Sequence, residues 1–147
     1  MPSDSPPPDP KAPLPVSQEE WRRRLTAAEF HILRGKGTER AGTGRLEKHQ
    51  GNGEYCCKGC GTPLYLADHK FQASCGWPAF DDEVKGAVQR HVDNSLGMRR
   101  VEITCARCDS HLGHVFEGEG MTSKNVRHCV NSASITFVGD DGTVIRG

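Results

Sequence analysis

Apolar and polar residues alternate in several short runs in the second half of the chain. The runs at 100–104 and 133–138 show the period of two that is typical of strands with one buried face. Residues 140–142 have the sequence Asp-Asp-Gly, a turn signal that leads into another apolar run at 143–145. Because short runs alternate with frequent turn signals, the pattern predicts an antiparallel, mainly β body.

Two helix-start signals follow each other nearer the N-terminus. Ser17 with Glu20, and Thr26 with Glu29, have the spacing of a capping box. The second helical segment ends at Gly35, the residue type most often found just beyond a helix. We therefore expect two short helices that pack on the outside of the β body.

The first sixteen residues differ in composition from the rest. Residues 1–16 are rich in proline and nearly free of large apolar side chains. Such a segment buries too little apolar surface to offset its ordering entropy, so we predict a disordered tail. Residues 17–147 have the length of one ordinary domain and are predicted to form it.

The charge and hydropathy of the chain argue against several classes of function. Lys plus Arg and Asp plus Glu number 19 each, whereas nucleic-acid-binding domains usually carry a basic excess. No apolar run approaches the roughly 20 residues that span a bilayer, and the N-terminus has no apolar signal-peptide region. We expect a cytoplasmic monomer that binds neither nucleic acid nor membranes.

Four of the seven cysteines form two CxxC pairs. The pairs are Cys57 with Cys60, and Cys105 with Cys108. Zinc takes four soft ligands in a tetrahedron, and two CxxC turns on neighbouring hairpins supply them. Because protein thiolates fill all four positions, we predict one structural zinc ion.

Two alternatives use these cysteines differently. One is a site made of Cys105, Cys108, His111 and His114, but the spacing from Cys108 to His111 is short for ligand pairs that face each other. It would also leave the first CxxC pair without a role. The other alternative is a thioredoxin-like redox pair, but that motif belongs to a βαβ unit, and the sequence has no such pattern.

Cys129 has the surroundings of a reactive thiol. Arg127 and His128 precede it, and His111 and His114 stand in a glycine-containing segment upstream. Cationic neighbours lower the pKa of a thiol and favour the reactive thiolate, so we predict a depressed pKa for Cys129. A cysteine with histidines elsewhere in the chain is a candidate nucleophile with acid–base partners.

The two remaining cysteines have different surroundings. Cys75 lies in a segment with Gly76 and Pro78, which predicts a loop that exposes the thiol. A mobile second thiol can resolve a sulfenic acid. Trp77 on the same loop is either part of the core or the wall of an apolar pocket. Cys56 is expected to be a small buried side chain whose pKa is not depressed.

Together these motifs resemble the methionine-R-sulfoxide reductase family, the B type of methionine sulfoxide reductases. The resemblance covers about residues 17–138. In chain order, the motifs that carry it are Gly35-Lys36-Gly37-Thr38-Glu39, Tyr55-x-Cys57-x-x-Cys60-Gly61, Cys75-Gly76-Trp77-Pro78-Ala79-Phe80, Arg100-Val101-Glu102-Ile103-x-Cys105-x-x-Cys108-x-x-His111-Leu112-Gly113-His114-Val115-Phe116 and Arg127-His128-Cys129-Val130-Asn131-Ser132.

The resemblance implies a fold and a reaction. The fold would be two small antiparallel sheets arranged like a barrel, with the zinc site remote from the active site. Cys129 would attack the sulfoxide sulfur of methionine-R-sulfoxide in proteins, with the free amino acid as a second candidate substrate. Cys75 would then resolve the sulfenic acid as a disulfide, and thioredoxin would reduce that disulfide.

The resemblance also implies roles for the residues around these thiols. Arg127 would assist Cys129, and Trp77 would pack against the substrate methyl group. Phe116 would line the same pocket. The groups around the sulfoxide oxygen would be His111, His114 and Asn131.

One alternative belongs to a different class of function. A non-enzymatic zinc-binding β module that binds a partner or small ligand explains the CxxC pairs equally well. It does not explain Cys75, Cys129 and Asn131 together with the two histidines. Thiol titration discriminates between the two, because the module has no need of a fast-reacting thiol.

Overall fold

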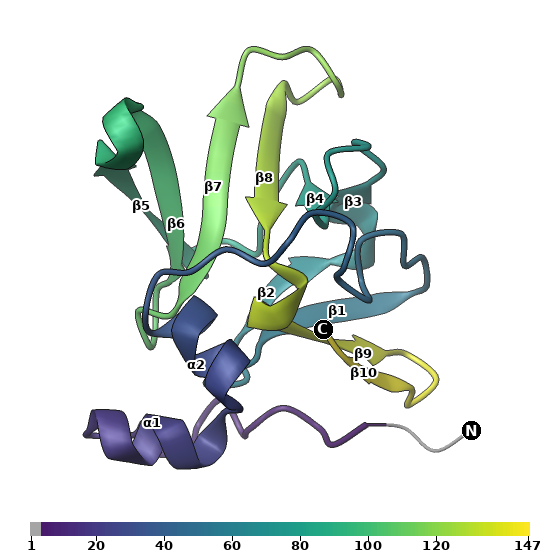
Figure 1. Ribbon diagram of the computed structural model, residues 1–147. Coiled ribbons are helices and arrows are strands. Elements are labelled where there is room, and N and C mark those ends of the chain that lie inside the picture. The colour runs from purple at the N-terminus through teal and green to yellow at the C-terminus, as the bar shows by residue number, and fades with distance from the viewer. Residues whose placement is uncertain (1–3) are drawn as a thin grey trace.

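The computed structural model describes residues 4–147, which form two antiparallel sheets and two short helices (Figure 1). The first sheet has the strand order β10-β9-β1-β2, and the second β3-β4-β8-β7-β6-β5. The first contains β1 (Gly53–Cys57), β2 (Pro63–Leu66), β9 (Ile135–Gly139) and β10 (Val144–Arg146). The second contains β3 (Lys70–Phe71), β4 (Ala79–Phe80), β5 (Val88–Asp93), β6 (Arg100–Cys105), β7 (His111–Glu117) and β8 (Val126–Val130). The predicted fold class is confirmed.

The three strands predicted from the sequence are present, and their bounds differ from the prediction by one or two residues. β9 begins at Ile135, because residues 132–134 form a 3₁₀ turn, η3 (Ser132–Ser134). Two further 3₁₀ turns are η1 (Ala67–His69) and η2 (Ser95–Gly97).

The helices α1 (Gln18–Arg24) and α2 (Ala27–Leu33) lie on the outside of the sheets, as predicted (Figure 1). The Thr26 side chain accepts the N–H of Glu29 while the Glu29 carboxylate accepts that of Thr26, which completes a capping box. Along residues 4–147, no helix is both long and apolar enough to cross a membrane.

One cluster of buried aromatic side chains joins the two sheets. Tyr55 and Tyr65 from the first sheet both contact Phe80 from the second. The Tyr65 ring stacks on Phe80 with a centroid separation of 4.1 Å, and Tyr55 meets the same ring edge-on at 5.0 Å. These contacts fix how the two sheets face each other, and so fix the frame that holds the site.

The segment before α1 has no helix or strand between residues 4 and 16. It runs along the folded body: the backbone N–H of Asp4 donates to the carbonyl of Val144 at 3.0 Å, and Arg107 donates to the carbonyl of Ala12. Residues 1–3 of the predicted tail lie outside the described residues. The disorder expected for residues 1–16, and the domain boundary at residue 17, stay predictions.

Candidate functional site

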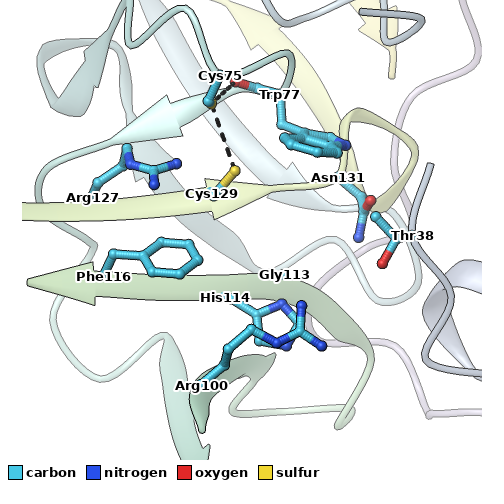
Figure 2. A pocket seen from close by; sticks show the side chains of 10 residues that line it. All are labelled: Thr38, Cys75, Trp77, Arg100, Gly113, His114, Phe116, Arg127, Cys129 and Asn131. Atoms are coloured by element: carbon cyan, nitrogen blue, oxygen red, sulfur yellow. Dashed lines mark hydrogen bonds between the residues drawn. The ribbon is translucent and has the colours of Figure 1, made fainter. Parts of the chain in front are cut away.

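A cavity of about 210 Å³ opens beside the six-stranded sheet, where β7, β8 and the loop before β4 meet (Figure 2). Seven of the eight residues predicted to form the active site line it, and His111 is the exception. The lining residues are Thr38, Cys75, Trp77, Arg100, Gly113, His114, Phe116, Arg127, Cys129 and Asn131.

Strand register places the central side chains of this cavity. In the antiparallel pairing of β7 with β8, His114 lies opposite Cys129, and Phe116 lies opposite Arg127. Residues directly opposite each other on such a pair project to the same face of the sheet, as do residues two apart on one strand. The four side chains therefore form one block on one face, with the imidazole beside the thiol.

The two non-ligand thiols at this site are close together. The Sγ atoms of Cys75 and Cys129 are 3.7 Å apart, and the Cys75 thiol also donates to the carbonyl of Trp77 at 3.3 Å (Figure 2). The loop that carries Cys75 turns at Gly76, whose φ of 94° is unfavourable for a side chain. A Cβ atom at Gly76 would also lie 2.7 Å from the Cβ of Ala41. The loop is thus closely packed against the segment that contains Ala41, and the two Sγ atoms are in van der Waals contact.

Glu39 organises the side of the cavity that faces the thiols. Its carbonyl accepts the indole N–H of Trp77 at 3.0 Å, and its backbone N–H donates to the Asn131 side chain at 2.9 Å. The Asn131 amide donates in turn to the carbonyl of Leu112 at 3.1 Å. Glu39 closes the Gly-Lys-Gly-Thr-Glu motif of the resemblance, but no role for it was predicted from the sequence.

Arg127 is held between an acid and an aromatic ring. Its Nε donates to Glu119 at 2.8 Å, and its guanidinium carbon lies 4.5 Å from the centroid of the Phe116 ring. The Arg127 charge lowers the pKa of Cys129. The predicted assisting role of Arg127 is therefore compatible with its position.

The predicted depressed pKa of Cys129 is wrong. Burial, together with the neighbouring Cys75 thiol, raises the pKa of Cys129 to about 12, which outweighs the lowering by Arg127. Burial likewise raises the pKa of Cys56 to about 12, so the expectation that the Cys56 thiol is not activated is confirmed.

His128 was expected to lie beside the Cys129 thiol, but it does not. Neighbouring residues of a strand point to opposite faces, so His128 turns away from Cys129 and into the core. There its Nδ1 forms a hydrogen bond of 2.9 Å with the hydroxyl of Tyr65. Burial lowers the pKa of His128 to about 4, which keeps this imidazole neutral.

The two upstream histidines occupy different positions. A β-bulge interrupts the pairing of β6 with β7 near Leu112, and brings the rings of His111 and His114 within 5.6 Å of each other. His114 lines the cavity, whereas His111 is buried beside it, with Nδ1 2.6 Å from a Glu102 carboxylate oxygen. Only one of the two imidazoles reaches the cavity surface in this structure.

The four CxxC cysteines form a separate cluster. All four are buried, and their Sγ atoms lie within 4.8 Å of one another. A tetrahedral metal with bonds of about 2.3 Å needs sulfur–sulfur edges of roughly 3.8 Å, and two of the edges measure 3.6 Å. The cluster fits a metal ion, and none of its members lines the cavity.

Arginines from the N-terminal helices bind the turns of this cluster. Arg24 donates to the carbonyl of Gly59, and Arg34 donates to that of Cys108, both at 2.7 Å. Both guanidinium groups also lie over the ring of Trp21. The helices are thereby attached to the metal-binding turns.

The match to a family model accounts for most of the chain. Residues 25–139 match the SelR domain. The chain belongs to this family. Among its relatives, the peptide methionine sulfoxide reductase B5 of Oryza sativa is 57% identical over 122 residues, which are 82% of this chain and 88% of the relative.

Further members of the SelR family show similar levels of identity. The chloroplastic peptide methionine sulfoxide reductase B2 of Arabidopsis thaliana is 53% identical over 86% of this chain, which corresponds to 62% of that longer protein. The bacterial enzyme from Chromohalobacter salexigens, named peptide methionine sulfoxide reductase MsrB, is 47% identical over 82% of this chain and 92% of its own. This SelR protein is thus related to reductases from plants and bacteria, and the resemblance seen in the sequence is confirmed.

Proposed function

We propose that this SelR protein is an oxidoreductase that reduces methionine-R-sulfoxide in proteins and peptides to methionine. Family membership supports the activity, and the pair of thiols 3.7 Å apart in the cavity supports its route. A non-enzymatic zinc module would have no need of such a pair.

In the first step, the Cys129 sulfur attacks the sulfoxide sulfur, and its thiol proton passes to solvent, from which His114 is later reprotonated. His114 delivers a proton to the sulfoxide oxygen, the bond between this oxygen and the methionine sulfur breaks, and the hydroxyl group is transferred to Cys129. The products are methionine and a Cys129 sulfenic acid, so methionine sulfoxide is reduced by two electrons and Cys129 is oxidised by two. Trp77 walls the space for the methyl group, with Phe116 opposite Arg127 on the neighbouring strand.

In the second step, the Cys75 thiol attacks the Cys129 sulfenic acid. The new Cys75–Cys129 disulfide forms as the sulfur–oxygen bond breaks, and the oxygen leaves as water. A dithiol reductant of the thioredoxin class then restores both thiols by exchange, and is itself oxidised to a disulfide. The short distance between the two Sγ atoms supports rapid closure.

The buried four-cysteine cluster is proposed to hold one zinc ion. Zinc suits four thiolate ligands, and when bound it serves as a structural cross-link with no open coordination position. Elemental analysis of soluble protein should give one zinc per chain, and zinc-free protein of full activity would contradict the assignment. We further propose that the enzyme acts as a monomer in the cytoplasm, where the ligand thiols remain reduced.

Single-turnover assays on a methionine-R-sulfoxide peptide test the thiol roles. Cys129→Ser should release no methionine, because a hydroxyl is a far poorer nucleophile. Cys75→Ser should still release close to one methionine per enzyme and leave a sulfenic acid that dimedone traps. Its steady turnover with thioredoxin should collapse.

Cys56→Ser is the matched control for both variants, because Cys56 is buried outside the cavity. It should keep the wild-type single-turnover yield and steady rate. Wild-type steady turnover by Cys75→Ser would mean that thioredoxin resolves Cys129 directly. Methionine release by Cys129→Ser would remove Cys129 as the nucleophile.

A further inference from the structure

Asp93, at the end of β5, is a buried carboxylate next to the cavity. The Asp93 side chain is 3% exposed, and its Oδ2 lies 2.9 Å from Nε2 of His114. Its Oδ1 accepts the backbone N–H of Ser95 at 3.0 Å. The carboxylate is therefore held from one side by the backbone and in contact with the imidazole on the other.

Charged groups from the loop after α2 and from β6 surround this pair. Lys36 and Arg100 each place a nitrogen 3.7 Å from the Asp93 carboxylate. Lys36 also reaches Glu102 at 3.3 Å, and Glu102 contacts His111. Asp93 is thus compensated by two cations, while the second carboxylate is engaged with the other histidine.

The charge state of Asp93 determines which nitrogen of His114 carries the proton. Hydrogen bonds from His114 and Ser95 hold the pKa of Asp93 well below its ordinary range, so its carboxylate is ionised and only accepts. The proton between Asp93 and His114 consequently resides on Nε2. Nδ1 is left as the ring nitrogen that can serve the cavity, where the imidazole lies across from Cys129 (Figure 2).

We propose that Asp93 is a positioning residue for His114: it holds the imidazole through Nε2, so that Nδ1 is the nitrogen that delivers the proton to the sulfoxide oxygen. This inference rests on the proposed function. When both ring nitrogens carry a proton, Nε2 still donates to Asp93 and Nδ1 donates into the cavity. After transfer, the neutral ring remains held with Nε2 donating to Asp93.

Asp93→Asn removes the charge and keeps a side chain of the same size that can accept the hydrogen bond. The single-turnover rate of methionine release should fall about tenfold or more near neutral pH. Asp82→Asn, the same change at an exposed carboxylate that pairs with Lys124 outside the cavity, should leave this rate unchanged.

A double-mutant cycle with His114→Gln separates positioning from a merely structural effect. If Asp93 acts through His114, Asp93→Asn should cost almost nothing in the His114→Gln background, because the acid is already absent. An additive loss in the double variant would overturn the proposal.

The unmodified enzyme gives a second test that does not depend on the folding of any variant. Long-range ¹H–¹⁵N correlation spectra of the ¹⁵N-labelled protein at alkaline pH should show neutral His114 protonated at Nε2. A proton on Nδ1 would overturn the proposal. If wild-type enzyme released no methionine at all, the proposed function would fail, whereas wild-type activity with an unaffected Asp93→Asn variant would refute this inference alone.

Discussion

At the scale of single residues, the side chains of two neighbouring residues on β8 face different environments. Cys129 faces the cavity, whereas His128 faces the buried aromatic cluster and bonds to Tyr65. Sequence proximity to Cys129 suggested an activating role for the imidazole, but alternation along the strand directs it into the core. His128 is consequently a buried neutral base, and its effect should appear in stability as a function of pH.

His128→Gln should make the free energy of unfolding depend less on pH below about pH 6.5. The folded-state pKa of His128 is about 4, below the ordinary value of 6.5, so the unfolded chain binds this proton more readily. Stability from the neutral imidazole is present above about pH 6.5 and is lost as pH falls towards 4. In wild type, the depressed pKa of His128 lowers the free energy of unfolding by about 2 kcal/mol between pH 7 and pH 4.5.

Denaturant unfolding of both proteins at a series of pH values measures the difference. Glutamine keeps an acceptor for the Tyr65 hydroxyl but does not titrate in this range. A profile that is equally steep in wild type and variant would show that other groups control acid unfolding.

At the scale of elements, β7 carries more of the site than any other strand. It supplies His114 and Phe116, its bulge brings His111 near His114, and Gly113 lines the cavity. Gly113 also permits close approach to β8: a Cβ atom there would lie 1.9 Å from the carbonyl oxygen of Cys129. The spacing of β7 and β8, and with it the imidazole–thiol geometry, depends on the missing side chain.

Gly113→Ala should therefore lower stability and activity together. The methyl group meets backbone rather than a flexible side chain, so the strands must separate, at a cost of about 2 kcal/mol or more. Thermal unfolding and the single-turnover rate measure the two effects. Gly51→Ala is the control, since its Cβ would meet only side-chain atoms, at 3.2 Å or more, and its retention of normal activity is expected.

The sequence predicted the residues of local motifs, but not the contacts that depend on how distant strands pair. The CxxC spacing predicted four clustered cysteines, and the resemblance predicted the residues around Cys129, because local motifs encode both. Asp93 and Arg100 were not assigned roles, since they reach the site only through the pairing of β5 with β6. The bulge that leaves His111 behind His114 depends likewise on how β6 aligns with β7. Burial, which raises the pKa of Cys129, is a property of the assembled sheets.

At the scale of the whole molecule, the cysteine cluster connects the two sheets. Cys57 ends β1 of the four-stranded sheet, and Cys105 ends β6 of the six-stranded sheet. Each of the two turns contributes the second cysteine of its pair. A bound metal therefore cross-links elements that are otherwise joined by side-chain packing and loops.

Cys105→Ser should release the metal and weaken the contact between the sheets. Metal binding is coupled to folding, so we expect Tm to fall by roughly 10 °C or more. Zinc content by elemental analysis and Tm by circular dichroism measure the change. Cys56→Ser, a neighbouring buried cysteine outside the cluster, should retain both the metal and the wild-type Tm.

The register of β7 against β8 has a consequence for when this protein acquires its reactivity. A slip of one residue would turn Cys129 towards the opposite face and leave His114 without its neighbour. A newly made or refolding chain thus lacks the paired imidazole and thiol until β7 and β8 have formed in the right alignment. Methionine release by refolding enzyme should accordingly lag behind collapse and rise with the last phase of sheet formation, so that catalysis itself reports the completion of folding.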